Sequence, residues 1–332
     1  GSITINSGTI EASVDSDAQG SGAAIGGGAN GSAGAITIKD GTVKATSRGD
    51  GAAIGGGSGK GASAITIENG TVTANAGGNG AAIGGGSDGG SGSIVINNGM
   101  VVANATGNGA AIGGGTRGGG GTVTIANGKV EATASGAGAS IGGGNAGTGS
   151  TVMVTGGEVK ANANIGGGEG ATVQGSLTVR GTGTSVSLVK GTLSELIGGN
   201  ITVEDGAEVL VEMDENVTVP RGQTLTIPAN VTLTIASGKT LTIEGKLEVN
   251  GTINGKGELY CFKAEEGGVI GADKIDQSGG LNYTPPCPHR WPEGKWEKYN
   301  PTDHKKVCMD CGTIKTEPHK WDEAGDIYVE CN

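Results

Sequence analysis

Short stretches in which β-branched and small residues alternate recur along the first half of the chain. The string Ile-Gly-Gly-Gly returns with a constant 29-residue period and then once more after a shorter interval. A fixed period of this length is typical of a structural repeat rather than of a low-complexity linker. The copies of the string begin at Ile25, Ile54, Ile83, Ile112, Ile141 and Ile165.

Each 29-residue unit contains two further alternating stretches. One has the form Ile-Thr-Ile, as at 36–38 and 65–67, and the next is centred on a valine, as at Val43 and Val72. Asp-Gly or Asn-Gly turns separate the two stretches. Alternation with a period of two between such turns predicts β-strands. The unit is therefore predicted to run strand, turn, strand, loop, strand, loop.

A unit of three short strands cannot bury its apolar side alone, so stacked units are expected. We predict an all-β fold, a right-handed parallel β-helix with one 29-residue unit per coil. Ile36 and Ile38 should point inward and stack on Ile65 and Ile67. The glycines after each inward isoleucine predict a corner with positive φ. A column of small residues lies beside the Ile-Gly-Gly-Gly strand, and it indicates either a flat surface for a partner or close packing within the coil corner: Ala24, Ala53, Ala82, Ala111 and Ser140.

The pattern divides the chain into three parts. Residues 1–170 form the regular β-helix of about six coils, and residues 171–282 continue it with shorter, irregular coils and a cap. Residues 283–332 form a small Cys/His-rich module. Its Pro-His-x-Trp string occurs at Pro288 and Pro318, and the second copy stops soon after Cys331. We therefore expect a truncated module in a fragment of a longer protein, with Gly1-Ser2 as a cloning remnant.

Composition narrows the range of partners. The net charge is −11 and the basic residues form no repeating stripe, which argues against nucleic acid. No apolar run approaches the length of about 20 residues that spans a bilayer, so this fragment is not expected to insert directly into a membrane. The 72 glycines fall largely at the recurring turns, while all 8 aromatic residues lie at or after Tyr260. A sugar-binding surface in the repeat region would therefore have to use hydroxyls, amides and acids.

One motif has the spacing of metal ligands. His304, Cys308 and Cys311, followed by His319, supply two thiolates and two imidazoles for a structural, tetrahedral zinc site. His289 is the alternative fourth ligand. Unliganded thiols or a Cys308–Cys311 disulfide are the other interpretations of this motif. A disulfide between Cys261 and Cys287, which would tie the tail to the β-helix, is a separate alternative. The chain has five cysteines, an odd number that fits truncation.

Carboxylates are the other residues that can carry chemistry. Glu131 and Glu158 fall near each other in the repeat, but their alternating spacing favours solvated charges on a strand face. The acidic stretches Glu204-Asp205 and 212–215 make calcium a candidate ligand, with exposed loop charge as the competing explanation. We assign no catalytic residue.

The repeated Gly-Ala-Ala-Ile-Gly-Gly-Gly and Ile-Thr-Ile-x-Asn-Gly-Thr-Val strings resemble the glycine-rich β-helical repeats of modular Gram-positive bacterial cell-surface proteins, described as adhesin-like or carbohydrate-binding-like. The tail is similar to the zinc-ribbon-like repeats with His-x-Trp and Cys-x-x-Cys that accompany them. The resemblance implies an extracellular protein, on the cell surface or secreted. It supplies no catalytic or binding residues.

These observations favour a non-enzymatic stalk or adhesin that makes multivalent contacts with a polysaccharide, host glycan or protein surface. A noncatalytic carbohydrate-binding segment of a polysaccharide-degrading enzyme is the first alternative. A polysaccharide lyase or glycosidase, with a cleft in the irregular section from Leu188 to Glu215, is the second.

The zinc motif generates a direct test. Metal analysis of the purified protein should find about one zinc per chain, as expected for a single closed site. Changing both Cys308 and Cys311 to serine should remove the metal because the site loses its two thiolate ligands. A metal-free chain with an intact fold would contradict the prediction.

Overall fold

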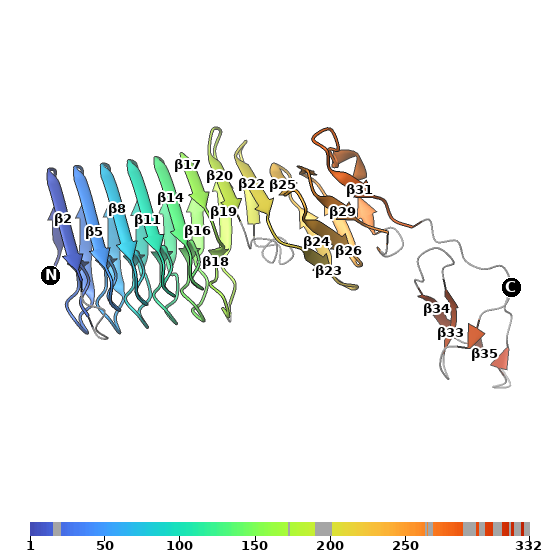
Figure 1. Ribbon diagram of the computed structural model, residues 1–332, viewed down its shortest axis with the longest axis horizontal. Helices are drawn as coiled ribbons and strands as arrows, with labels where there is room; N and C mark the ends of the chain where they lie inside the picture. Colours follow the sequence, from blue (N-terminus) through green and yellow to red (C-terminus); the bar gives the residue numbers. More distant parts are fainter. Residues whose placement is uncertain are drawn as a thin grey trace.

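The computed structural model describes residues 1–15, 21–171, 173–189, 201–262, 264, 268–287, 297–298, 303–307, 314–318, 320–321 and 327–328. Up to residue 287 the described chain is a parallel β-helix whose coils follow one another along the long axis (Figure 1). In the glycine-rich part each full coil contributes one strand to each of three parallel sheets, A, B and C. The predicted all-β parallel β-helix and the three strands per unit are confirmed.

The strands of these sheets are given in their order across each sheet. Sheet A contains β1 (Ile3–Ile5), β4 (Ala33–Ile38), β7 (Ala62–Ile67), β10 (Ser93–Ile96), β13 (Thr122–Ile125), β16 (Thr151–Val154), β19 (Ser176–Arg180) and β21 (Ile201–Glu204). Sheet B contains β2 (Thr9–Val14), β5 (Thr42–Ser47), β8 (Thr71–Ala76), β11 (Met100–Ala105), β14 (Lys129–Ala134), β17 (Glu158–Ala161), β20 (Ser185–Val189), β22 (Glu208–Met213), β25 (Val231–Ile235) and β28 (Thr252–Gly255). Sheet C contains β18 (Ile165–Gly166), β15 (Ile141–Gly142), β12 (Ile112–Gly113), β9 (Ile83–Gly84), β6 (Ile54–Gly55) and β3 (Ile25–Gly26).

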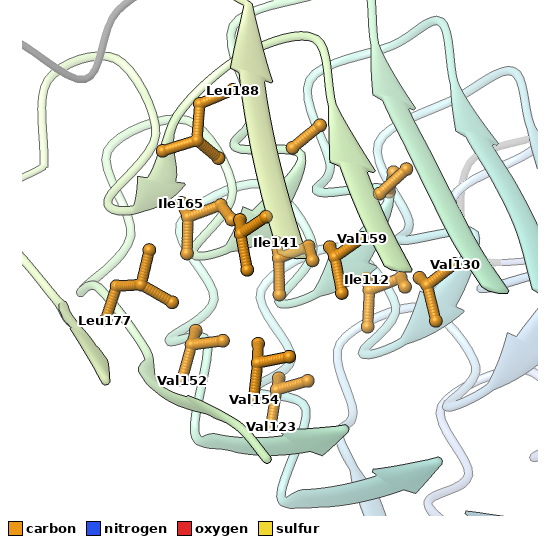
Figure 2. Close-up of a cluster of buried hydrophobic side chains, with 14 of the residues drawn as sticks. Ile112, Val123, Val130, Ile141, Val152, Val154, Val159, Ile165, Leu177 and Leu188 are labelled. Atoms are coloured by element: carbon orange, nitrogen blue, oxygen red, sulfur yellow. The ribbon is translucent and has the colours of Figure 1, made fainter. Parts of the chain in front are cut away.

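Equivalent residues of neighbouring coils stack in register. Ile36 pairs with Ile65, and Ile65 pairs with Ile94. These side chains are almost fully buried, as are the valines and isoleucines that sheets B and C turn inward. Figure 2 shows side chains from the three sheets meeting in one core, among them Ile141, Val152 and Val159. The predicted aliphatic ladders are therefore present.

The second residue of each sheet C strand is a glycine with positive φ. Gly84 has φ 139°, a conformation that residues with a Cβ rarely adopt. A Cβ on Gly84 would also overlap the carbonyl group of Gly113 in the next coil. The same overlap recurs along the whole sheet. The predicted glycine corner is thus confirmed, and close approach of one backbone to the next requires it.

The column of small residues beside sheet C is closely packed and is not an exposed face. Ala53, Ala82 and Ala111 are fully buried. The loop after Gly-Gly-Gly closes over this column, since Ser87 N donates to Asp50 O at 2.7 Å and Thr116 N donates to Asn79 O at 2.8 Å. Of the two interpretations, close packing within the corner is confirmed, and a flat partner surface at this column is wrong.

After β21 the coils change shape. Sheet B continues, while two new parallel sheets, D and E, replace the other two sides and make the coil triangular. Val217 pairs with Leu241 and Thr240 pairs with Glu258, so the coils here are shorter than those of the regular part and differ in length. Sheet D contains β23 (Val217–Val219), β26 (Thr240–Ile243), β29 (Glu258–Tyr260) and β31 (Asn282–Thr284), and sheet E contains β24 (Thr224–Ile227), β27 (Lys246–Val249) and β30 (Val269–Ile270).

The remaining elements are short. A 3-10 turn, η1 (Ala272–Lys274), follows β30. In the tail, β33 (Asp303–Val307) pairs antiparallel with β32 (Glu297–Lys298) and with β34 (Ile314–Pro318). A second antiparallel pair joins β35 (Lys320–Trp321) to β36 (Ile327–Tyr328).

The corner can be tested at one position. Gly84→Ala should lower the free energy of unfolding by about 3 kcal/mol or more, because it adds backbone strain and overlap with the next coil. Gly28→Ala is the matched control, since Gly28 is exposed and has nothing within 4 Å of the position that a Cβ would take; it should change stability by less than about 0.5 kcal/mol. Urea unfolding followed by far-UV circular dichroism measures both. Equal stability of the two variants would contradict the close-approach argument.

Candidate binding surfaces

The outer side of sheet B is the longest continuous strand face in the described chain. Its strands follow one another from coil to coil (Figure 1), and their paired registers place the outward positions in columns. One column changes character along its length, from charged and polar residues at the start to Leu210, Thr232 and Thr252 near its end. The face is therefore chemically different at its two ends.

Charges on the regular part of this face pair with one another. Glu11 accepts a hydrogen bond from Lys44 of the next coil at 2.7 Å, and Lys160 pairs with Glu158 of its own strand at 3.1 Å. The hydrogen bond and charge of Lys44 lower the pKa of the Glu11 carboxyl, and Glu11 in turn raises the pKa of Lys44. These groups are exposed, so the pairs add little stability. They leave the regular face locally neutral, which supports the interpretation of Glu131 and Glu158 as solvated charges.

Side-chain amides form ladders along the axis of the β-helix. Asn79 Nδ2 donates to Asp50 Oδ1 at 2.9 Å, and Asn104 Nδ2 donates to Asn75 Oδ1 at 2.9 Å. Each ladder uses amide groups that would otherwise be offered to a ligand. The ladders join Asp40, Asn69 and Asn98, then Asp50, Asn79 and Asn108, and finally Asn75 and Asn104.

The triangular part of sheet B is hollowed on its outer side. One hollow of about 450 Å³ is lined by Glu208, Leu210, Thr232, Thr252 and Lys274, among others. A second hollow of about 430 Å³ is lined by Glu212, Thr234 and Asn254, which follow on the same strands, and by Asp276 and Ser278, which follow η1. Both volumes lie in the range of small-molecule sites.

The sequence placed a candidate cleft in the section from Leu188 to Glu215, which supplies Glu208, Leu210 and Glu212 to these hollows. It did not predict the lining from β25, from β28 or from the segment around Asp276. The available signal was the alternation in β22, where Leu210 occupies an outward position between two glutamates. Its side chain remains 45% exposed, unlike the inward valines on either side.

The predicted zinc ligands lie at the other end of the chain. His304 is in β33, where its backbone pairs with Glu317. Cys308, Cys311, His319 and the alternative ligand His289 lie outside the described residues. Among residues that the structure does describe, no group of three His, Cys, Asp or Glu side chains is placed to hold a metal ion. The zinc and calcium sites stay predictions.

Cys261 lies in the core at the last coil. Its thiol is fully buried, and this burial raises its pKa to about 12. The Cys261 N–H donates to Thr284 O at 2.9 Å, and Cys287, also buried, donates from its N–H to Phe262 O at 3.2 Å. Cys261 is a free thiol here, so the alternative disulfide with Cys287 is not formed.

Comparison with known proteins agrees with the fold. Residues 36–58 and 65–87 match the model of the beta helix repeat family, so this section is a β-helical repeat region. No curated protein and no solved structure matches the chain. The described part of the chain has no helix long and apolar enough to span a membrane.

The buried thiol leads to a reactivity prediction. At pH 8 a thiol with a pKa of about 12 is ionised in roughly one molecule in 10⁴, and only the thiolate is nucleophilic. Cys261 should therefore resist iodoacetamide in the folded protein and react fully in guanidinium chloride, as measured by peptide mass spectrometry. Alkylation of Cys261 in the folded chain at the rate of an exposed cysteine would show that it is not buried.

Proposed function

We propose that this chain is a non-enzymatic extracellular surface protein, a β-helical stalk or adhesin that makes multivalent contacts with host or matrix ligands. The observation that supports this best is the in-register repetition of outward side chains. Thr37 lies beside Thr66 on sheet A, and Thr42 lies beside Thr71 on sheet B. Adjacent copies are one strand spacing apart, about 4.8 Å. A ligand with a repeating structure therefore meets the same surface several times.

The β-helix also holds these copies rigidly. Backbone hydrogen bonds connect the stacked coils, and one hydrophobic core runs through all of them. Fixed spacing matters because multivalent binding gains most when the sites match the span of the ligand. In a flexible glycine-rich chain of the same composition, the spacing of the sites would not be fixed to match the ligand.

Each single contact on the regular faces should be weak. The opposite charges on sheet B are paired, and many amides are engaged in ladders. No aromatic residue precedes Tyr260 to stack against a sugar ring. Weak sites at a fixed spacing are the situation in which avidity exceeds the affinity of one site, by about 10²-fold to 10⁴-fold.

The two alternative functions would use the triangular part of the β-helix. Its two hollows favour a noncatalytic carbohydrate-binding segment of a polysaccharide-degrading enzyme as the second candidate. The lyase or glycosidase candidate would use the second hollow, where Glu212 and Asp276 both contribute carboxylates.

The tail completes the proposal. A structural zinc bound by His304, Cys308, Cys311 and His319, or by His289 in place of one histidine, would stabilise a module too small to bury much core. The proposed location is extracellular, on the cell surface or secreted. The proposed partners are a polysaccharide, host glycan or host protein surface.

Multivalency can be tested by shortening the β-helix. A variant without residues 66–123 loses two complete 29-residue units and joins Ile65 to Thr124, so the inward and outward alternation is kept. On dense arrays of glycans and matrix proteins the full chain should bind more tightly than this variant, by several-fold or more. On sparse arrays, where only single contacts form, the two proteins should bind alike.

Two outcomes would contradict the proposal. The first is a full chain that binds no glycan or matrix protein even on a dense array, which would indicate a purely structural role. The second is equal binding of the full chain and the shortened variant on dense arrays. Circular dichroism of the shortened variant is the control for its fold.

A further inference from the structure

We propose that the outer face of β22, β25 and β28 is a groove that binds a neutral, extended oligosaccharide. This inference rests on the proposed function in one respect, because it supposes that the chain meets ligands outside the cell. The groove itself is a separate surface. It lies in the triangular part and does not repeat from coil to coil.

The floor of the groove is made by outward side chains of three neighbouring strands. Leu210 lies beside Thr232, and Thr232 lies beside Thr252. Two residues further along each strand, Thr234 lies between Glu212 and Asn254. Thr234 Oγ1 donates to Asn254 Oδ1 at 2.7 Å. This hydrogen bond uses the side-chain oxygen of Asn254 and not its amide nitrogen.

A wall stands where the floor ends. Ile275 forms a parallel bridge with Ile253, and Asp276 N donates to Ile253 O at 2.8 Å, so this segment covers the edge of β28. η1 precedes the bridge, and a turn follows it in which Asp276 Oδ1 accepts a hydrogen bond from Ser278 N at 2.9 Å. Lys274 Nζ donates to Asn250 O at 3.0 Å and ties the wall to the floor.

The two hollows described above lie end to end in this groove. Glu208 and Leu210 line the first hollow and Glu212 lines the second, so the pair follows the direction of β22. β22 has six residues, which corresponds to about 20 Å of strand. The site is therefore suited to an extended ligand rather than to a single compact one.

The lining specifies the chemistry of that ligand. Hydroxyls, amides and carboxylates dominate, and they can donate to or accept from the vicinal hydroxyls of sugars. The half-exposed Leu210 offers an apolar contact for the C–H side of a sugar ring. Glu208, Glu212 and Asp276 outnumber Lys256 and Lys274, which disfavours an acidic polysaccharide.

An extended peptide fits less well. Peptides that add to a sheet need a free edge with unpaired backbone groups. The edge next to β28 is already covered at Ile253 by the segment around Ile275. A ligand in this groove must therefore bind through side chains, as a polyhydroxylated chain does.

Isothermal titration of the full chain with cellohexaose, laminarihexaose and mannohexaose tests the groove, with hexagalacturonate as the acidic comparison. At least one neutral hexasaccharide should bind, and more tightly than hexagalacturonate. Glu212→Gln and Asn254→Ala should each weaken that binding about tenfold, because the first replaces a charged acceptor by a neutral amide and the second removes an amide from the groove. Asn104→Ala and Glu131→Gln change the same residue types on the regular part of sheet B and should stay within about twofold of the unchanged chain.

The remaining outcomes separate this inference from the proposed function. If no neutral hexasaccharide binds, or if groove and control variants weaken binding equally, the groove inference is wrong even when dense arrays show multivalent binding. If the hexasaccharide binds in the groove but removal of two coils leaves array binding unchanged, the multivalent function is wrong and the groove stands. Shortened sugars detected by mass spectrometry after incubation would overturn a purely binding role.

Discussion

The close approach of one coil to the next along sheet C determines most of what this chain can be. At Gly84 and its equivalents there is no room for a Cβ, and the backbone has a positive φ that glycine adopts without strain. This contact fixes the stacking distance on one side of the coil. The isoleucine ladders and the amide ladders then fall into register on the other sides. Glycine is therefore the structural requirement of this fold, not a sign of disorder.

The outer surface changes where the chain no longer needs a glycine at each corner. After β18 sheet C ends, larger inward residues such as Leu233 and Leu241 fill the core, and the coils become triangular. The coils then differ in length, and one connection is long enough to form η1 and to reach over the edge at Ile253. Uniform coils make a flat face, while unequal coils make a wall and a groove. The regular and irregular parts of one sheet can thus serve two different kinds of contact.

The repeat, its strands and its inward positions could be predicted because each is a local pattern repeated at a constant period, as at Ile36 and Ile65. The sequence left open whether the column of Ala82 is exposed or packed, because the contacts that decide this, such as Ser87 N to Asp50 O, join different coils. The candidate cleft from Leu188 to Glu215 included only the β22 side of the groove, for a similar reason. Its lining comes from strands around Leu210, Thr232 and Thr252, and its wall is held by one bridge at Ile275. Pairings of unequal spacing leave no periodic signal in the sequence.

The coil length also sets how this molecule responds to tension. A coil in the regular part contacts only its two neighbours, so the terminal coil can detach without disturbing the rest. Each detached 29-residue coil frees about 100 Å of extended chain. Under tension the molecule should therefore lengthen in steps of one coil. Each step leaves a shorter β-helix with the same arrangement of strands.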